Sequence, residues 1–200
     1  MKVLIADDHS IIRKGMKIHL QSNFSISKIE EVKSCNQVMN LLLQRDFTHL
    51  ILDLMLIDGS TLEILPNIKQ LYPQLKILVY SMQPEIVYKP LLKKYGVFYF
   101  IAKASDEEHF NQKLYNFFNN YSEINVQEDA VSKNPFTKLT PREMEILFYL
   151  LRGQSTKETS ELLNVTMSTI STTKQKILEK VNAKNVKELT DLATIYQINY

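Results

Sequence analysis

The sequence predicts an α/β domain with a doubly wound, five-stranded parallel sheet, followed by a smaller all-α domain. Residues 1–120 alternate five times between a short apolar run and an amphipathic segment, which is the pattern of an open α/β domain. After residue 139 no strand pattern remains, and four helical stretches follow. Residues 121–136 have no clear period, so we expect them to link a first domain of residues 1–120 to a second of residues 137–200.

The predicted strands are near-continuous apolar runs, typical of strands that are buried on both faces of a parallel sheet. They are KVLIA (2–6), HLILD (49–53), KILVYS (76–81) and VFYFIAK (97–103), with the more polar KIEEV (28–32) expected at an edge. Amphipathic periods predict the helices of this domain at residues 11–20, 35–44, 61–71, 85–95 and 106–118.

The second domain should contain helices at residues 141–152, 156–163, 167–181 and 186–197. Thr140 precedes a proline and stands three residues before Glu143, so we expect a capping box at the start of the first helix. Gly153 is suited to end that helix.

Composition indicates a cytoplasmic protein. No apolar run approaches the roughly 20 residues needed to span a bilayer, and the first apolar run is too short for a signal peptide. The single cysteine, Cys35, excludes an internal disulfide and suits a reducing compartment. The net charge is −1 for residues 1–132 and +3 for residues 133–200, which favours an anionic partner for the C-terminal part only.

Polar residues stand where four of the predicted strands end. They are Asp7 and Asp8, Asp53, Ser81 and Lys103. Parallel strands bring their carboxyl ends to one rim, where α/β domains bind ligands. Adjacent carboxylates repel one another, so a divalent cation, a shared proton or solvent must compensate. We favour Mg²⁺, a hard cation that prefers oxygen ligands, beside a central aspartate that could act as a nucleophile.

Several motifs make the chain resemble a two-domain response regulator of the NarL/FixJ type. IADDHSIIRKG resembles the family's acidic start, LILDLMLIDGSTLEIL its phosphoacceptor region, and VYSM and YGVFYFIAK its switch segments. The resemblance implies a flavodoxin-like receiver domain that a sensor histidine kinase phosphorylates on Asp53. It also implies that Mg²⁺ binds Asp7, Asp8, Asp53 and the backbone carbonyl of Met55, and that Ser81, Phe100 and Lys103 act as the switch residues.

Two positions in the first domain depart from the family pattern. Ile57 stands four residues after Asp53, where a proline is usual, and Asp58-Gly59 is expected to form a differently built turn. Pro90 falls inside a predicted helix, where it should remove a hydrogen bond.

The segment from residue 139 onward resembles the LuxR-type DNA-binding domain. LTPRE, RGQSTKE, NVTMSTI and KILEKVNAKN follow in that family's order, and the resemblance implies a helix-turn-helix whose second helix, residues 167–181, enters the major groove. Either Thr166 or Ser168 should cap that helix. The residues expected to meet DNA are Lys157, Thr166, Ser168, Thr169, Ser171, Thr172, Lys174, Gln175 and Lys176. Ser171 and Thr173 stand where the family usually has Lys and His.

The resemblance also implies a homodimer when the protein is active, reading an inverted repeat in double-stranded DNA. The last predicted helix of the chain would supply the dimer face through Leu189, Leu192, Ala193 and Tyr196.

Two other functions stay open at this stage. The chain could be a receiver-like transcription factor that is never phosphorylated and binds DNA constitutively or under partner control. Less favoured is a hydrolase that forms an aspartyl-phosphate, which would need a further acid or base and a substrate pocket near Asp53. In the leading interpretation the chain is no enzyme beyond gaining and losing its own phosphoryl group.

Overall fold

The computed structural model describes residues 1–83, 85–119, 121, 134–196 and 198. The chain divides into two compact units, Met1–Met82 with Leu92–Ile124 and Gln83–Leu91 with Asn125–Tyr200. Most of the segment expected as a linker, residues 121–136, lies outside the described residues.

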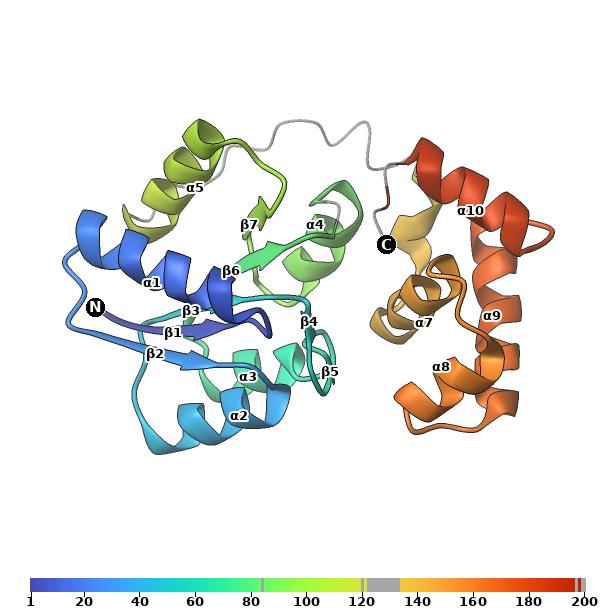
Figure 1. Ribbon diagram of the computed structural model, residues 1–200, viewed down its shortest axis with the longest axis horizontal. Helices are drawn as coiled ribbons and strands as arrows, with labels where there is room; N and C mark the ends of the chain where they lie inside the picture. The colour runs from blue at the N-terminus through green and yellow to red at the C-terminus, as the bar shows by residue number, and fades with distance from the viewer. Residues whose placement is uncertain (84, 120, 122–133, 197, 199–200) are drawn as a thin grey trace. The chain divides into compact units, whose positions relative to one another are not determined.

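The first unit contains a five-stranded, fully parallel sheet, as the sequence predicts. Its strands are β1 (Lys2–Ala6), β2 (Lys28–Val32), β3 (His49–Leu52), β6 (Lys76–Ser81) and β7 (Tyr99–Ala102). Their order in the sheet is β2-β1-β3-β6-β7, so the polar β2 lies at an edge (Figure 1). From β1 the chain adds β2 on one side of the sheet and then β3, β6 and β7 on the other, so the direction of strand addition reverses beside β1. An open α/β sheet binds its ligands at such a switch point.

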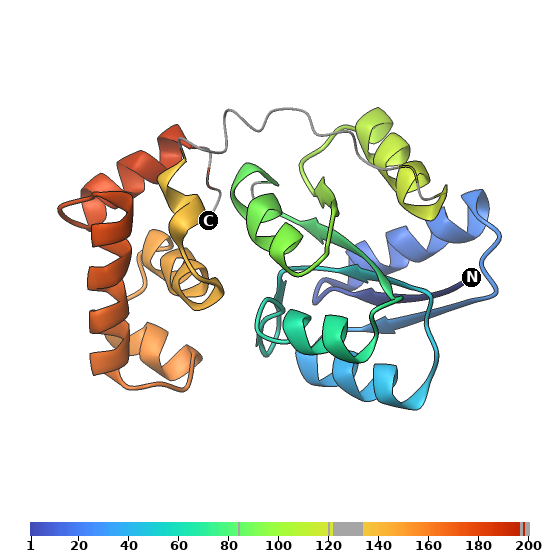
Figure 2. The ribbon, with the colours of Figure 1, turned by 180° about the vertical axis from the view of Figure 1, so that it is seen from behind.

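Helices cover both faces of this sheet. α1 (Ser10–Asn23) and α5 (Glu107–Asn119) lie on one face, and α2 (Cys35–Gln44) and α3 (Leu65–Leu71) on the other (Figures 1 and 2). α4 (Glu85–Lys94) contains Pro90, as expected. One apolar core lies between β1, β3 and the helices α1 and α5, with Val3, Ile51, Leu20 and Phe117 each at most 2 % exposed.

α3 begins four residues later than the sequence indicates. The side chain of Thr61 donates to the backbone carbonyl of Asp53 at 2.8 Å, which holds the expected first turn in the loop instead. The helix then begins at Leu65, with a proline in its first turn.

A two-stranded hairpin that the sequence did not predict follows Asp53. β4 (Met55–Leu56) pairs antiparallel with β5 (Gly59–Ser60), and Ile57 and Asp58 form the loop between them. Gly59 has a φ of 133°, a conformation that residues with a Cβ rarely adopt.

The second unit is helical. It contains the short 3₁₀ helix η1 (Pro135–Lys138) and the helices α7 (Pro141–Leu151), α8 (Thr156–Leu162), α9 (Met167–Val181) and α10 (Val186–Ile195). The predicted capping box at Thr140 and Glu143 is present, and Glu143 also accepts from Lys180 Nζ of α9 at 2.7 Å. The buried apolar side chains of the second unit include Leu147, Ile170, Ile177 and Leu189. Among the helices the structure describes, none has the length and apolar character needed to cross a bilayer.

Candidate functional site

Two buried aspartates meet because the parallel strands end in register. Asp7 follows β1 and Asp53 follows β3, and the N–H of Asp53 donates to the carbonyl of Ala6 at 2.8 Å. Asp8 and His9 complete the group: one potential ligand atom from each of these four residues lies within 4.8 Å of the others. Asp7 and Asp53 are buried, and Asp8 and His9 are exposed.

Lys103 and Ser81 point into this group from the ends of β7 and β6. Lys103 Nζ lies 2.6 Å from Asp7 Oδ2 and 2.5 Å from Asp53 Oδ2. Ser81 Oγ donates to Asp53 Oδ1 at 2.6 Å. Two carboxylates thus contact one ammonium, and with the exposed Asp8 beside them the cluster keeps an excess of negative charge.

Burial and the neighbouring charges oppose each other at Asp53. Burial raises the pKa of the Asp53 carboxyl, and the Lys103 ammonium and the Ser81 hydroxyl only partly offset that rise. For Lys103, burial lowers the pKa, but contact with Asp53 and Asp7 outweighs it, so the pKa lies above its ordinary value. A further cation in the cluster would favour the ionised form of Asp53.

Several groups that the sequence analysis did not single out hold these aspartates in place. The guanidinium of Arg13 donates to the Asp7 carbonyl at 2.6 Å, and the backbone N–H of His9 donates to Asp7 Oδ1 at 2.8 Å. The imidazole of His9 also lies 2.7 Å from Asp8 Oδ1. Thr61 holds the Asp53 carbonyl from the other side of the hairpin. These roles depend on loop geometry, which leaves no periodic signal in the sequence.

Of the two remaining residues expected at this site, the structure shows Met55 beside Asp53 and Phe100 in the core of the sheet. The N–H of Met55, in β4, is 3.5 Å from Asp53 Oδ1. Phe100 is fully buried in β7, beside Val79 of β6, and its carbonyl accepts from Lys113 Nζ at 3.0 Å.

The donor set fits a hard divalent cation. Carboxylate oxygens from three residues converge, two of them buried, and the excess negative charge of the cluster matches a dication. The acidic pocket is therefore compatible with a divalent metal.

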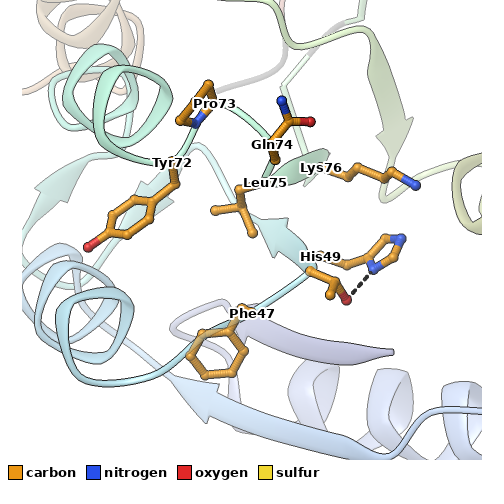
Figure 3. Close-up of a pocket in the computed structure, with 8 residues that line it drawn as sticks. Phe47, His49, Tyr72, Pro73, Gln74, Leu75 and Lys76 are labelled. Carbon is orange, nitrogen blue, oxygen red and sulfur yellow. Dashed lines mark hydrogen bonds between the residues drawn. The ribbon is translucent and has the colours of Figure 1, made fainter.

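A separate pocket lies at the opposite end of the strands, where β3 and β6 begin. Its volume is about 360 Å³. Phe47, Tyr72, Pro73 and Leu75 line it together with His49 and Lys76 (Figure 3). None of the acidic residues described above lines this pocket.

α9 presents an exposed polar face. Thr166, rather than Ser168, caps the helix, since its hydroxyl accepts from the N–H of Thr169 at 3.2 Å. Of the residues expected to meet DNA, Lys174 is half-buried and the others are exposed: Lys157, Thr166, Ser168, Thr169, Ser171, Thr172, Gln175 and Lys176. Gln175 bonds to Glu179 at 3.1 Å. α8 and α9 have the order and the short connection of a helix-turn-helix.

The four residues expected at a dimer face differ in accessibility. Leu189 and Ala193 are fully buried in the second unit, because α10 packs these positions against its own domain. Leu192 and Tyr196 keep partial exposure, and the ring centroid of Tyr196 lies 6.0 Å from that of Phe136. The most exposed large apolar side chain of α10 is Ile195.

Two families match consecutive parts of the chain. Residues 3–115 match the family described as the response regulator receiver domain. Residues 137–193 match the family described as bacterial regulatory proteins, luxR family.

Whole-length similarity extends over both parts. The fimbriae Z protein of Escherichia coli (strain K12) is 28% identical over 98% of this chain and 97% of that protein. The oxygen regulatory protein NreC of Staphylococcus carnosus (strain TM300) is 29% identical over 96% of each. Among solved structures, RcsB of Salmonella enterica serovar Typhimurium, bound to promoter P1flhDC with BeF₃⁻, has a TM-score of 0.75 at 23% identity and covers 98% of each chain.

Proposed function

Because the chain belongs to the NarL/FixJ response regulators, in which a LuxR-type DNA-binding domain follows a receiver domain, we propose that phosphorylation of Asp53 controls its binding to DNA. The observation that carries this proposal is the convergence of Asp7, Asp53, Ser81 and Lys103 within hydrogen-bonding distance. The proposed phosphoryl donor is a sensor histidine kinase.

The reaction moves one phosphoryl group. A carboxylate oxygen of Asp53 forms a P–O bond as the P–N bond of the donor's phosphohistidine breaks, and the imidazole leaves with its electron pair. Lys103 Nζ and Ser81 Oγ already contact the two carboxylate oxygens, so they are placed to stabilise charge on the transferred group. Hydrolysis of the P–O bond later returns the carboxylate and inorganic phosphate.

The acidic residues would hold Mg²⁺ as the cofactor. Asp7, Asp8, Asp53 and the Met55 carbonyl are its proposed ligands, and the bound cation would neutralise charge on the phosphoryl oxygens. Ser81, Phe100 and Lys103 are the proposed switch residues: Ser81 and Lys103 would bind the phosphoryl group, and the inward movement of Ser81 would reposition Phe100.

The output of the switch is binding to double-stranded DNA through α9. A dimer on an inverted repeat fits the two-fold symmetry of such sites. Leu192 and Tyr196 support this dimer through α10, whereas the burial of Leu189 and Ala193 assigns those two to the domain core. RcsB, a protein of the same fold, is described as forming dimers bound to DNA.

Intact-mass measurement with a small phosphoryl donor tests the first step. The wild-type chain should gain one phosphoryl group only when Mg²⁺ is present, and Asp53→Asn should gain none. Asp46→Asn, at an exposed aspartate outside the cluster, is the matched control and should behave as wild type. No gain in the wild-type chain with Mg²⁺, or an equal gain in Asp53→Asn, would refute the proposal.

The second step is tested by DNA affinity. Duplexes selected from a randomised pool should bind the phosphorylated chain more tightly than the unphosphorylated chain, as fluorescence anisotropy would report. Equal affinity in both states would favour a receiver that is not a phosphorylation switch.

A further inference from the structure

The hairpin β4–β5 is attached to Asp53 at both of its ends. The N–H of Met55 approaches Asp53 Oδ1 at 3.5 Å as the hairpin begins. After the hairpin ends, the Thr61 hydroxyl donates to the Asp53 carbonyl at 2.8 Å and the Thr61 N–H donates to the Leu54 carbonyl at 2.9 Å. A shift of the hairpin would therefore move both Met55 and the groups that orient Asp53.

The tip of the hairpin is attached to the N-terminus of α2. Asp58 Oδ1 accepts from the N–H of Cys35 at 2.6 Å, and Asp58 Oδ2 accepts from the N–H of Asn36 at 3.0 Å. Ser34, the helix's own N-cap, accepts from Gln37 at 3.2 Å. The hairpin thus bonds two of the first three backbone N–H groups of α2. At this end of the helix the Asp58 carboxylate also interacts favourably with the helix dipole.

The carboxylate of Asp58 responds to this environment. Its burial would raise the pKa, but the N–H groups of Asn36 and Cys35 hold the pKa below its ordinary value.

Ile57 supplies another bond to the same region. Its N–H donates to the carbonyl of Lys33 at 3.3 Å, just before α2. Proline has no N–H and could not make this bond. Ile57 and Asp58 thus act together: both attach the hairpin to the segment that leads into α2.

We propose that Asp58 is a positioning residue, which fixes the hairpin and Met55 against the N-terminus of α2 and thereby maintains the divalent-cation affinity of the Asp7–Asp8–Asp53 cluster. This inference rests on the proposed function, because it assigns to Asp58 the support of the same metal site. Asp58 is not itself a ligand: its carboxylate oxygens bond to α2.

Three variants of the full chain test the inference. Asp58→Ala removes both bonds to α2, and Asp58→Asn keeps one acceptor oxygen. Ser34→Ala removes the other cap of the same helix and leaves the hairpin bonds in place, so it controls for loss of helix capping alone. The readouts are amide hydrogen exchange of residues 54–61 without metal, and Mg²⁺ affinity by titration calorimetry.

In Asp58→Ala we expect faster exchange across residues 54–61 and a loss of Mg²⁺ affinity of about tenfold, the lower end of the effect of groups that support metal ligands. Asp58→Asn should recover part of both, and Ser34→Ala should change neither.

Two results would overturn the inference while the proposed function stands. One is unchanged exchange or unchanged Mg²⁺ affinity in Asp58→Ala, and the other is an equal loss of Mg²⁺ affinity in Ser34→Ala. A wild-type chain that binds no Mg²⁺ would overturn both the proposed function and this inference.

Discussion

His49 shows how a single residue can make stability depend on pH. It is 3% exposed, and its ring lies 5.2 Å from that of Phe117 and 5.0 Å from that of Phe118. Its Nδ1 bonds to the Thr48 hydroxyl at 2.8 Å, as the dashed line in Figure 3 marks. Burial, with a smaller effect of Lys76, lowers the pKa of His49 to about 4.

The lowered pKa of His49 predicts how the free energy of unfolding changes with pH. Between the ordinary value of 6.5 and the folded value of about 4, the unfolded chain binds a proton that the folded chain does not. The free energy of unfolding should therefore fall with decreasing pH, by at most about 3 kcal/mol across the whole window. Urea denaturation at several pH values between 7 and 5 measures it.

Two variants separate the effect of His49 on stability from that of other titrating groups. Asp53, whose pKa is raised, contributes with the opposite sign, because the folded chain then holds the extra proton. His49→Gln should lose the decline seen in the wild-type chain, and His109→Gln, at an exposed histidine, should retain it. An unchanged decline in His49→Gln would show that other groups cause it.

The residues of the cluster could be predicted to different degrees. Asp7, Asp53, Ser81 and Lys103 were predictable because parallel strands place their ends on one rim, and the structure does bring these four together. The contacts of Asp58 were not, since its partners lie 22 and 23 residues away in sequence and the hairpin that carries it is too short to show a period.

At the scale of elements, the turn between α8 and α9 depends on an unusual backbone conformation. Asn164 has a φ of 50°, in the left-handed region, where asparagine and glycine are tolerated best. The following N–H, of Val165, donates to the carbonyl of Ser160 at 3.0 Å, and Thr166 then caps α9. The turn thus sets where the exposed face of α9 begins.

Substitutions at Asn164 should follow backbone preference. Asn164→Val should lower the free energy of unfolding of the second unit by about 1–2 kcal/mol, because a β-branched residue strongly disfavours this conformation. Asn164→Gly should stay within a few tenths of a kcal/mol of wild type. Urea denaturation followed by circular dichroism checks both, and equal stability of the two variants would contradict the explanation.

Element boundaries were predictable where a helix has a local signal for its ends. The limits expected for α2 and α9 agree with the structure, since Ser34 and Thr166 cap them. The predicted start of α3 was wrong because the hydrogen bond from the Thr61 hydroxyl to the Asp53 carbonyl holds the first predicted turn in the loop.

At the scale of the whole molecule, charge separates the two parts of the chain. Residues 133–200 carry a net charge of +3, and residues 1–132 a net charge of −1. The affinity for DNA should therefore depend on salt through the second part alone, because each contact between a lysine and a phosphate releases counterions.

Removing two lysines of α9 should reduce this salt dependence. The double variant Lys174→Ala/Lys176→Ala should make the negative slope of log K against log salt concentration shallower by about 1.8, at about 0.9 for each contact. Anisotropy measurements across a salt series give the slope. Lys2→Ala/Lys14→Ala, which removes the same charge from the first unit, should leave the slope unchanged, and a reduced slope there would contradict the assignment.

The division into an α/β part and a helical part could be predicted because the period of the apolar residues changes from strand-like to purely helical near residue 139. This signal spans dozens of residues, so single irregular positions such as Pro90 do not obscure it. The hairpin at the acidic cluster has no such redundancy, which explains why only the structure reveals it.

The bridge that Lys103 makes between Asp7 and Asp53 has a consequence for how the cluster takes up metal. A dication that enters meets an ammonium already in place, 2.6 Å from one carboxylate and 2.5 Å from the other. Loading the cluster would then exchange an internal cation for an external one. Its equilibrium would reflect the difference between two attractions, so Lys103 would compete with any dication that binds the cluster.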